Sequence, residues 1–183
     1  MMKTKTTGFV AFLSISIIII LSITAVVGTL LIIAPIPNEA TAQQQQGVQE
    51  FDAILTSAAE VPPVQSSASG FAELEVEEGS DNMEYGIIVM NIDKVTQAHI
   101  HQGSSSEAGP VVATLFNPST PTGPITEELT AGSITSANLE GPLQGKQLSD
   151  LIALIQNGQA YVNVHTEQNP DGEIRGTIEV DTD

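Results

Sequence analysis

The sequence predicts an all-β domain, built as a β-sandwich or a flattened barrel of about eight strands with one short helix. Two features of the chain after residue 46 carry this prediction. Short runs rich in β-branched residues are separated by clusters of glycine, proline, asparagine and serine. Several runs alternate apolar and polar residues, which is the period of a strand with one buried face. Short strands at this spacing are typical of sandwiches and barrels.

The first four strands are predicted from alternation and from apolar runs. Residues 51–55 and 71–76 alternate, and the glutamates of the second run are expected to face outward. Residues 83–92 form the longest apolar run of this part of the chain and predict a central strand buried on both faces. Residues 96–102 follow as the next strand.

Two further strands are expected in the middle of the chain, over residues 111–116 and 131–135. Residues 117–126 contain three prolines, which lack the N–H group that a strand ladder needs. This stretch is therefore predicted to be a loop.

The last part of the chain predicts one helix and then a hairpin. Residues 148–156 carry apolar side chains at helical spacing, and Gly158 stands where a helix C-terminal cap belongs. Residues 160–166 and 173–180 are two strand patterns. The segment 167–172 between them ends in Pro-Asp-Gly, which is turn chemistry.

The N-terminal segment, residues 1–42, is predicted to be an export signal. Lys3 and Lys5 precede an apolar run at about residues 9–34, which is long enough to cross a bilayer as a hydrophobic helix. Residues 40–42 (Ala-Thr-Ala) form a small-x-small pattern that a signal peptidase reads. Two interpretations stay open, a cleaved signal peptide and a retained transmembrane anchor.

Either interpretation places the rest of the chain outside the cytoplasm, as a secreted or membrane-anchored protein. Residues 43–48 are predicted to be a flexible glutamine-rich linker, and residues 49–183 a single domain. The chain after residue 42, about 140 residues, is long enough to close one hydrophobic core. The chain has no cysteine, which excludes disulfides and thiol chemistry.

The chain is strongly acidic, with a formal net charge of −17. Nucleic acids and anionic membrane surfaces both require a basic face to neutralise phosphate. We therefore expect no nucleic-acid partner, and contact with a membrane only through the N-terminal helix if that helix is retained.

The three histidines of the chain predict a metal site. His99 and His101 are two residues apart in a predicted strand, so both imidazoles point to one side while Ala98 and Ile100 point to the other. His165 lies in the first strand of the hairpin. If the two strands are neighbours, the three nitrogens would suit copper or zinc, with a fourth position open for water. The alternative is that these are solvated or structural histidines.

Several polar residues are expected to support this site. Tyr161 and Asn163 share a strand face with His165, and carboxylates at the hairpin turn are candidates to fix a histidine tautomer: Glu173, Glu167 and Asp171. The loop at residues 103–109 is expected to lie beside the histidine strand and to cover the site. Arg175 is predicted to form a structural ion pair with Glu173, Glu179 or Glu73, with anion binding as the alternative. No residue is predicted to be catalytic.

The histidine segments are similar to the signature of a known family. They read Ala98-His99-Ile100-His101-Gln102-Gly103 and Tyr161-Val162-Asn163-Val164-His165-Thr166, and the second continues to Gly176. Together with Glu60-Val61-Pro62-Pro63-Val64 and Gly109-Pro110-Val111-Val112, they resemble the CHRD domain, the module named after chordin, over roughly residues 49–181. The resemblance implies an immunoglobulin-like Greek-key barrel, similar to copper/zinc superoxide dismutases, in which a His-x-His strand supplies copper ligands.

The resemblance implies an extracytoplasmic binding module with no established catalytic activity, whose partner is an extracellular protein or glycan. The competing function is a copper- or zinc-binding protein, or a small metalloenzyme, that uses the three histidines. Fold similarity does not carry an activity with it, so the two alternatives must be separated at the site itself.

Overall fold

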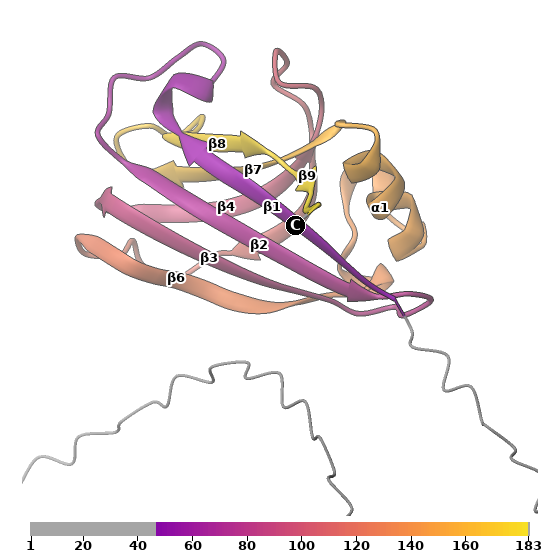
Figure 1. Cartoon of the computed structure of the whole chain (residues 1–183). Helices are drawn as coiled ribbons and strands as arrows, with labels where there is room; N and C mark the ends of the chain where they lie inside the picture. Colours follow the sequence, from indigo (N-terminus) through magenta and orange to yellow (C-terminus); the bar gives the residue numbers. More distant parts are fainter. Residues whose placement is uncertain (1–46, 183) are drawn as a thin grey trace, which may run out of the picture. The chain divides into compact units, whose positions relative to one another are not determined.

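The computed structural model describes residues 47–182, which form a nearly closed barrel of eight antiparallel strands with one short α-helix (Figure 1). The elements are β1 (Val48–Thr56), β2 (Ser69–Glu77), β3 (Met83–Ile92), β4 (Val95–Gln102), β5 (Val111–Phe116), β6 (Ile125–Ile134), α1 (Leu148–Gln156), β7 (Ala160–Thr166), β8 (Ile174–Thr177) and the short β9 (Glu179–Val180). The strand order is β5-β4-β7-β8-β1-β2-β3-β6, and β9 pairs with β1. The two end strands, β5 and β6, contact each other, which brings the sheet close to closure.

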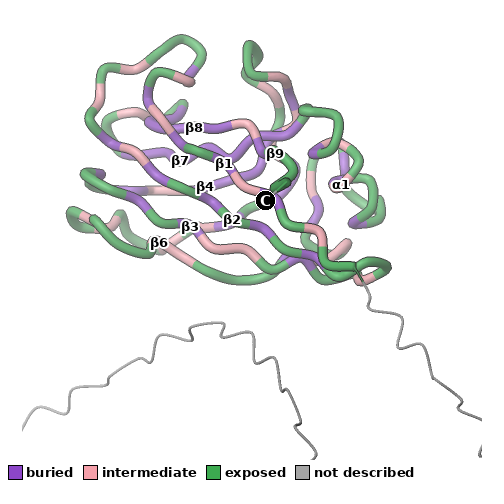
Figure 2. The backbone as a smooth tube through the Cα atoms, in the orientation of Figure 1, coloured by how far each residue is buried: buried purple, intermediate pink, exposed green. Residues whose placement is uncertain are grey.

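The core forms because alternate residues of each strand point into the barrel. In β1, Phe51, Ala53 and Leu55 are buried, and exposed and buried residues alternate along the neighbouring strands (Figure 2). Within residues 47–182, the buried core side chains lie between Phe51 and Ile178. The described strands therefore enclose a hydrophobic core of their own, and residues 43–183, which form a separate compact unit, are expected to fold on their own.

The helix α1 lies at one end of the barrel and ends as the sequence predicts (Figure 1). Its residues Leu148, Leu151 and Ile155 are buried, as their spacing requires. Gly158 follows with a φ of +65°, and its N–H donates to the carbonyl of Ile155. A left-handed conformation at this position favours glycine, so the predicted cap is confirmed.

Three predictions about strands need correction. β3 is buried on one face only, with Ile87 and Val89 in the core but Ile88 and Met90 exposed, because an antiparallel barrel wall presents its outer face to solvent. β6 begins at Ile125 rather than residue 131; register shifts against β3 interrupt its apolar alternation and hide the strand in the sequence.

The third correction concerns the final strand, predicted as one run over 173–180. Its two parts, β8 and β9, are separated at Ile178, which is fully buried and donates its N–H to the Ala160 carbonyl. Ile178 therefore remains with β7 before β9 joins β1.

The predicted hydrophobic helix of residues 1–42, and all of the linker before Gly47, lie outside the described residues. Within residues 47–182, no helix has the length and apolar character needed to cross a membrane.

Candidate metal centre

The structure brings all three histidines together on one face of two neighbouring strands. His99 and His101 on β4 and His165 on β7 have ring centroids 5.0–5.7 Å apart. One nitrogen from each ring lies within 4.8 Å of one nitrogen from each of the others. Ala98 and Ile100 point into the core with no exposed surface, as predicted. The histidines are therefore on the outer side of the barrel wall.

This outer face is covered, because each histidine is only 7–8% exposed. Two backbone carbonyls from loops contact the histidine rings. The Gly109 carbonyl, from the loop after β4, lies 2.8 Å from Nδ1 of His101, and the Pro170 carbonyl, from the turn after β7, lies 3.0 Å from Nδ1 of His165. The predicted loop at 103–109 thus lies over the histidine strand.

These two hydrogen bonds determine the tautomers. A carbonyl oxygen only accepts, so Nδ1 of His101 and Nδ1 of His165 must each carry a hydrogen and donate it. In a neutral ring the proton at Nδ1 leaves Nε2 with a free lone pair. The backbone therefore prepares Nε2 of both rings as acceptors or metal ligands.

Each imidazole has one buried nitrogen without a hydrogen-bond partner in the described part of the chain. These atoms are Nδ1 of His99, Nε2 of His101 and Nε2 of His165. A buried polar atom left unsatisfied costs about 1–3 kcal/mol, and such atoms are uncommon in native structures. Three of them on converging rings form a donor set that fits one metal ion bound by imidazole.

The imidazoles are neutral at neutral pH, the form that binds metals. The pKa of His99 is lowered to about 4, first by burial and then by repulsion from the two neighbouring imidazoles. Burial also lowers the pKa of His101 and of His165, against their hydrogen bonds to the loop carbonyls. A metal ion would therefore not have to displace protons from these rings.

The Tyr161 ring stacks against the His101 ring, and the Arg175 guanidinium stacks on the Tyr161 ring. The Tyr161 ring lies nearly parallel to the His101 ring, at 10° and 5.0 Å between centroids. The guanidinium carbon of Arg175 is 3.7 Å from the centroid of the Tyr161 ring, a cation–π contact. Arg175 also donates to the carbonyls of Ser104 and Glu107, at 2.9 and 3.0 Å. It thereby ties β8 to the loop that covers the site.

The predicted ion pair of Arg175 is wrong. In the described residues this arginine forms no salt bridge with any of the three predicted carboxylates, Glu73, Glu173 and Glu179. The reason is that loop carbonyls take its donors. Glu173 instead accepts hydrogen bonds from Ser66, Thr166 and Asn169 and braces the hairpin turn.

In the part of the chain that the structure describes, the polar side chains expected to orient a histidine form no hydrogen bond to one. Glu173 is occupied in the turn, Glu167 forms a surface salt bridge with Lys94 at 2.9 Å, and the Asn163 side chain donates to the Asp171 carbonyl at 3.5 Å. Backbone carbonyls perform the orienting role instead. Sequence patterns carry no direct signal for such carbonyls, although the Gly-Pro pair that supplies one of them was part of the family resemblance.

Glu140 is a charged neighbour of the site that the sequence patterns did not indicate. Its carboxylate accepts a hydrogen bond of 2.7 Å from Thr114, which lies opposite His99 on β5. The negative charge of Glu140 acts to raise the pKa of His99, against burial. A carboxylate placed here would favour a bound cation.

Glu60 and Asn163 form a second buried polar group beside the hairpin. Glu60 Oε1 and Asn163 Oδ1 have no hydrogen-bond partner in the described residues, and both lie within 2.7 Å of where a Cβ on Gly172 would be. Burial raises the pKa of Glu60 to about 7, against the charge of Arg175. At neutral pH this carboxyl is thus partly protonated.

The change Glu60→Gln is expected to remove a pH dependence of stability. The pKa of Glu60 is about 7 when folded and about 4.5 when unfolded, so its contribution is fully present below pH 4.5 and is lost as pH rises through 7. Glutamine stays neutral. The stability of the variant relative to wild type should therefore increase by about 2 kcal/mol between about pH 5 and pH 8, measured by urea unfolding with a chelator present.

The control for this change is Glu127→Gln, which removes one exposed negative charge from β6. Equal effects of Glu60→Gln at both pH values would show that Glu60 does not carry a raised pKa.

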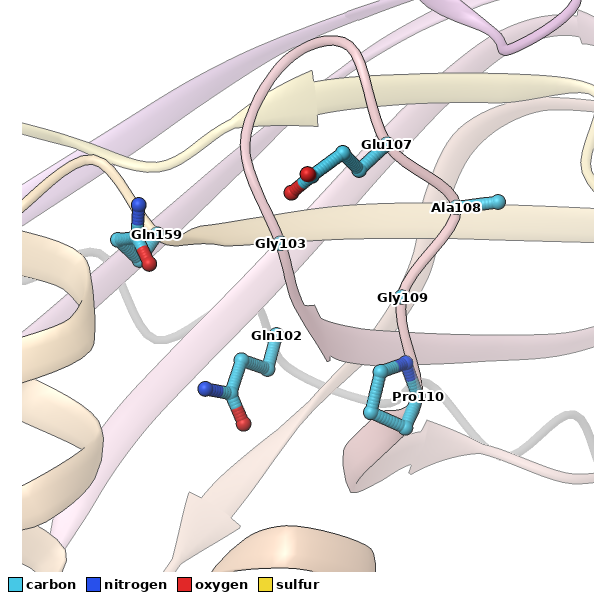
Figure 3. Close-up of a pocket in the computed structure, with 7 residues that line it drawn as sticks. All are labelled: Gln102, Gly103, Glu107, Ala108, Gly109, Pro110 and Gln159. Carbon is cyan, nitrogen blue, oxygen red and sulfur yellow. The ribbon is translucent and has the colours of Figure 1, made fainter.

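A surface hollow lies beside the covering loop and does not contain the histidines. Its lining comes from the end of β4, the loop that follows it and the residue just before β7: Gln102, Gly103, Glu107, Ala108, Gly109, Pro110 and Gln159 (Figure 3). The same loop therefore lines the hollow and bonds to His101 through the Gly109 carbonyl.

Comparison with known proteins identifies one family. The model of the CHRD domain matches residues 51–178, which is most of the chain and nearly all of the barrel. A search of curated proteins and a search of solved structures found no match.

Proposed function

The chain belongs to the CHRD domain family, and on that premise we propose that it is a CHRD-type binding module that holds one copper or zinc ion. The ligands are His99, His101 and His165. The module acts outside the cytoplasm, an assignment supported by the apolar run and the Ala-Thr-Ala pattern near the N-terminus. Its finer fold class is an immunoglobulin-like Greek-key barrel, supported by the non-sequential neighbours β4–β7 and β3–β6.

One observation carries the metal assignment: each of the three converging imidazoles has a buried nitrogen without a partner. Structural histidines would be expected to satisfy both ring nitrogens. Here, loop carbonyls bond Nδ1 of His101 and of His165, while Nε2 of both rings has no hydrogen-bond partner in the described residues. The candidate ligand atoms that the three rings offer lie within 4.8 Å of one another, which supports a shared ion.

The donor set restricts the metal. Imidazole nitrogen suits copper and zinc, whereas calcium and magnesium require oxygen ligands. Three protein nitrogens leave a coordination position open, which is the arrangement of catalytic rather than structural zinc sites. This feature supports the second candidate, a small metalloenzyme, beside the binding role that the family implies.

The test is the metal content of residues 43–183, produced without a His tag and titrated separately with Cu²⁺ and Zn²⁺. Mass spectrometry should find about one tightly bound ion per chain, lost in His101→Ala and in His165→Ala. Circular dichroism would establish that each variant is folded. The control is the double change Glu73→Gln and Glu75→Gln, which removes surface carboxylates on β2 and should leave the metal content unchanged.

Unchanged metal content after the double change His99→Ala and His101→Ala would refute the three-histidine site. If the metal is bound as expected, redox and hydrolytic assays of the loaded protein separate the two candidates. A redox or hydrolytic activity that the wild type shows and His165→Ala lacks would favour the metalloenzyme. If the metal-loaded wild type shows neither activity, the binding module is favoured.

A further inference from the structure

An apolar row crosses the outer face of the barrel on strands that do not carry the histidines. Ile54 on β1, Phe71 on β2 and Ile88 on β3 are direct neighbours in the strand register, and they are 72%, 38% and 50% exposed. Met90, next along the outer face of β3, is also exposed. Side chains on this face alternate with core residues, so their exposure follows from the register. Isolated exposed apolar residues are common, but three in register form a continuous patch.

Carboxylates border this apolar row on the same face. Asp52 and Glu73 are paired in the register immediately beside it, and the next row consists of Glu50, Glu75 and Glu84. Like charges directly opposite each other destabilise a sheet. Partial burial raises the pKa of the Glu75 carboxyl, and the surrounding glutamates raise it further. The arrangement is therefore unfavourable for the domain alone.

Both features indicate a partner with positive charge and apolar side chains. Such a partner would cover the exposed Ile54, Phe71 and Ile88 and relieve the repulsion between the carboxylates. A second copy of this chain would place one acidic border against another, and the net charge of −17 opposes that association. An anionic membrane is opposed for the same reason.

We propose that the apolar row with its acidic border docks a lysine- or arginine-rich segment of another protein that also carries apolar side chains. The row supplies contact area and the border supplies orientation and rapid association. This interaction does not depend on the histidines, which lie on β4 and β7. The module can therefore be tested for a protein partner whether or not it binds metal.

The probe is a short peptide in which lysine alternates with leucine, compared with oligo-lysine of the same length. Titration of ¹⁵N-labelled residues 43–183 should shift the amide signals around Ile54, Phe71 and Ile88. The alternating peptide should bind about tenfold more tightly than oligo-lysine, since the apolar row contributes to the first only. Added salt should weaken both.

The double change Ile54→Ser and Ile88→Ser should lower the affinity for the alternating peptide about tenfold and leave the affinity for oligo-lysine unchanged. Both positions are exposed, so the fold is expected to tolerate them. The matched control is Val61→Ser with Val180→Ser, two exposed apolar residues outside the row, which should have no effect.

Three outcomes would overturn the proposal. The first is equal binding of the two peptides, which indicates unspecific charge attraction. The second is that the shifted signals lie elsewhere or that the row variant binds as wild type does. The third is self-association of the free domain, seen by sedimentation and abolished in the row variant, which would assign the face to a second copy.

Discussion

Addition of Zn²⁺ or Cu²⁺ to the metal-free domain is expected to raise its Tm by about 10 °C, and a chelator should reverse the shift. A ligand that binds only the folded state stabilises it by mass action, by about 2.7 kcal/mol at a hundredfold excess over Kd. The three nitrogens come from two strands, β4 and β7. His165 follows His101 by more than 60 positions in the sequence, so the unfolded chain does not hold the three ligands together. Differential scanning calorimetry with and without metal measures the effect.

His165→Ala separates specific binding from general effects of added metal. This variant should show no metal-dependent shift, whatever its own Tm, because two of the three donors remain on β4 alone. The variant with the surface double change Glu73→Gln and Glu75→Gln should show the same metal-dependent rise in Tm as the wild type. A shift of the same size in His165→Ala would place the ion elsewhere and contradict the assignment.

The features that the sequence predicts best are those that depend on local chemistry. Alternation places the strands, and Gly158 ends the helix because a left-handed position favours glycine. Burial of β3 on one face and the start of β6 at Ile125 depend on how the strands pair. A solvent-facing wall leaves Ile88 and Met90 exposed, and no local pattern distinguishes that arrangement from burial on both faces.

In the candidate site, too, the sequence predicts what depends on local spacing and misses what depends on the tertiary structure. The two-residue spacing of His99 and His101 places both on one strand face, and the structure brings His165 to them through the pairing of β4 with β7. The orienting groups were missed because they are backbone carbonyls, which every residue has. The partner of Arg175 was predicted from charge, whereas the structure satisfies its donors with carbonyls of a loop about 70 positions earlier in the chain.

Gly109→Ala is expected to cost about 3 kcal/mol of stability and to lower the Tm by about 10 °C. A Cβ at this position would overlap the backbone carbonyl of Gln102, and backbone cannot rotate away as a side chain can. Gly123→Ala is the matched control, since a Cβ there would meet nothing within 4 Å. The control should be neutral or slightly stabilising. Urea unfolding of the metal-free proteins measures both.

The same change should also weaken metal binding, because Gly109 bonds to the site through both of its backbone groups. Its carbonyl accepts the Nδ1 hydrogen of His101, and its N–H donates to the Tyr161 hydroxyl at 2.9 Å. Moving this backbone frees the His101 ring and its stacked partner, and loss of such orienting bonds costs about 10- to 100-fold in metal affinity. If Gly109→Ala loses stability but binds metal as tightly as Gly123→Ala does, the covering loop supports the fold without orienting the ligand. If both properties fall together, one backbone position couples the packing of the loop to the geometry of the three histidines.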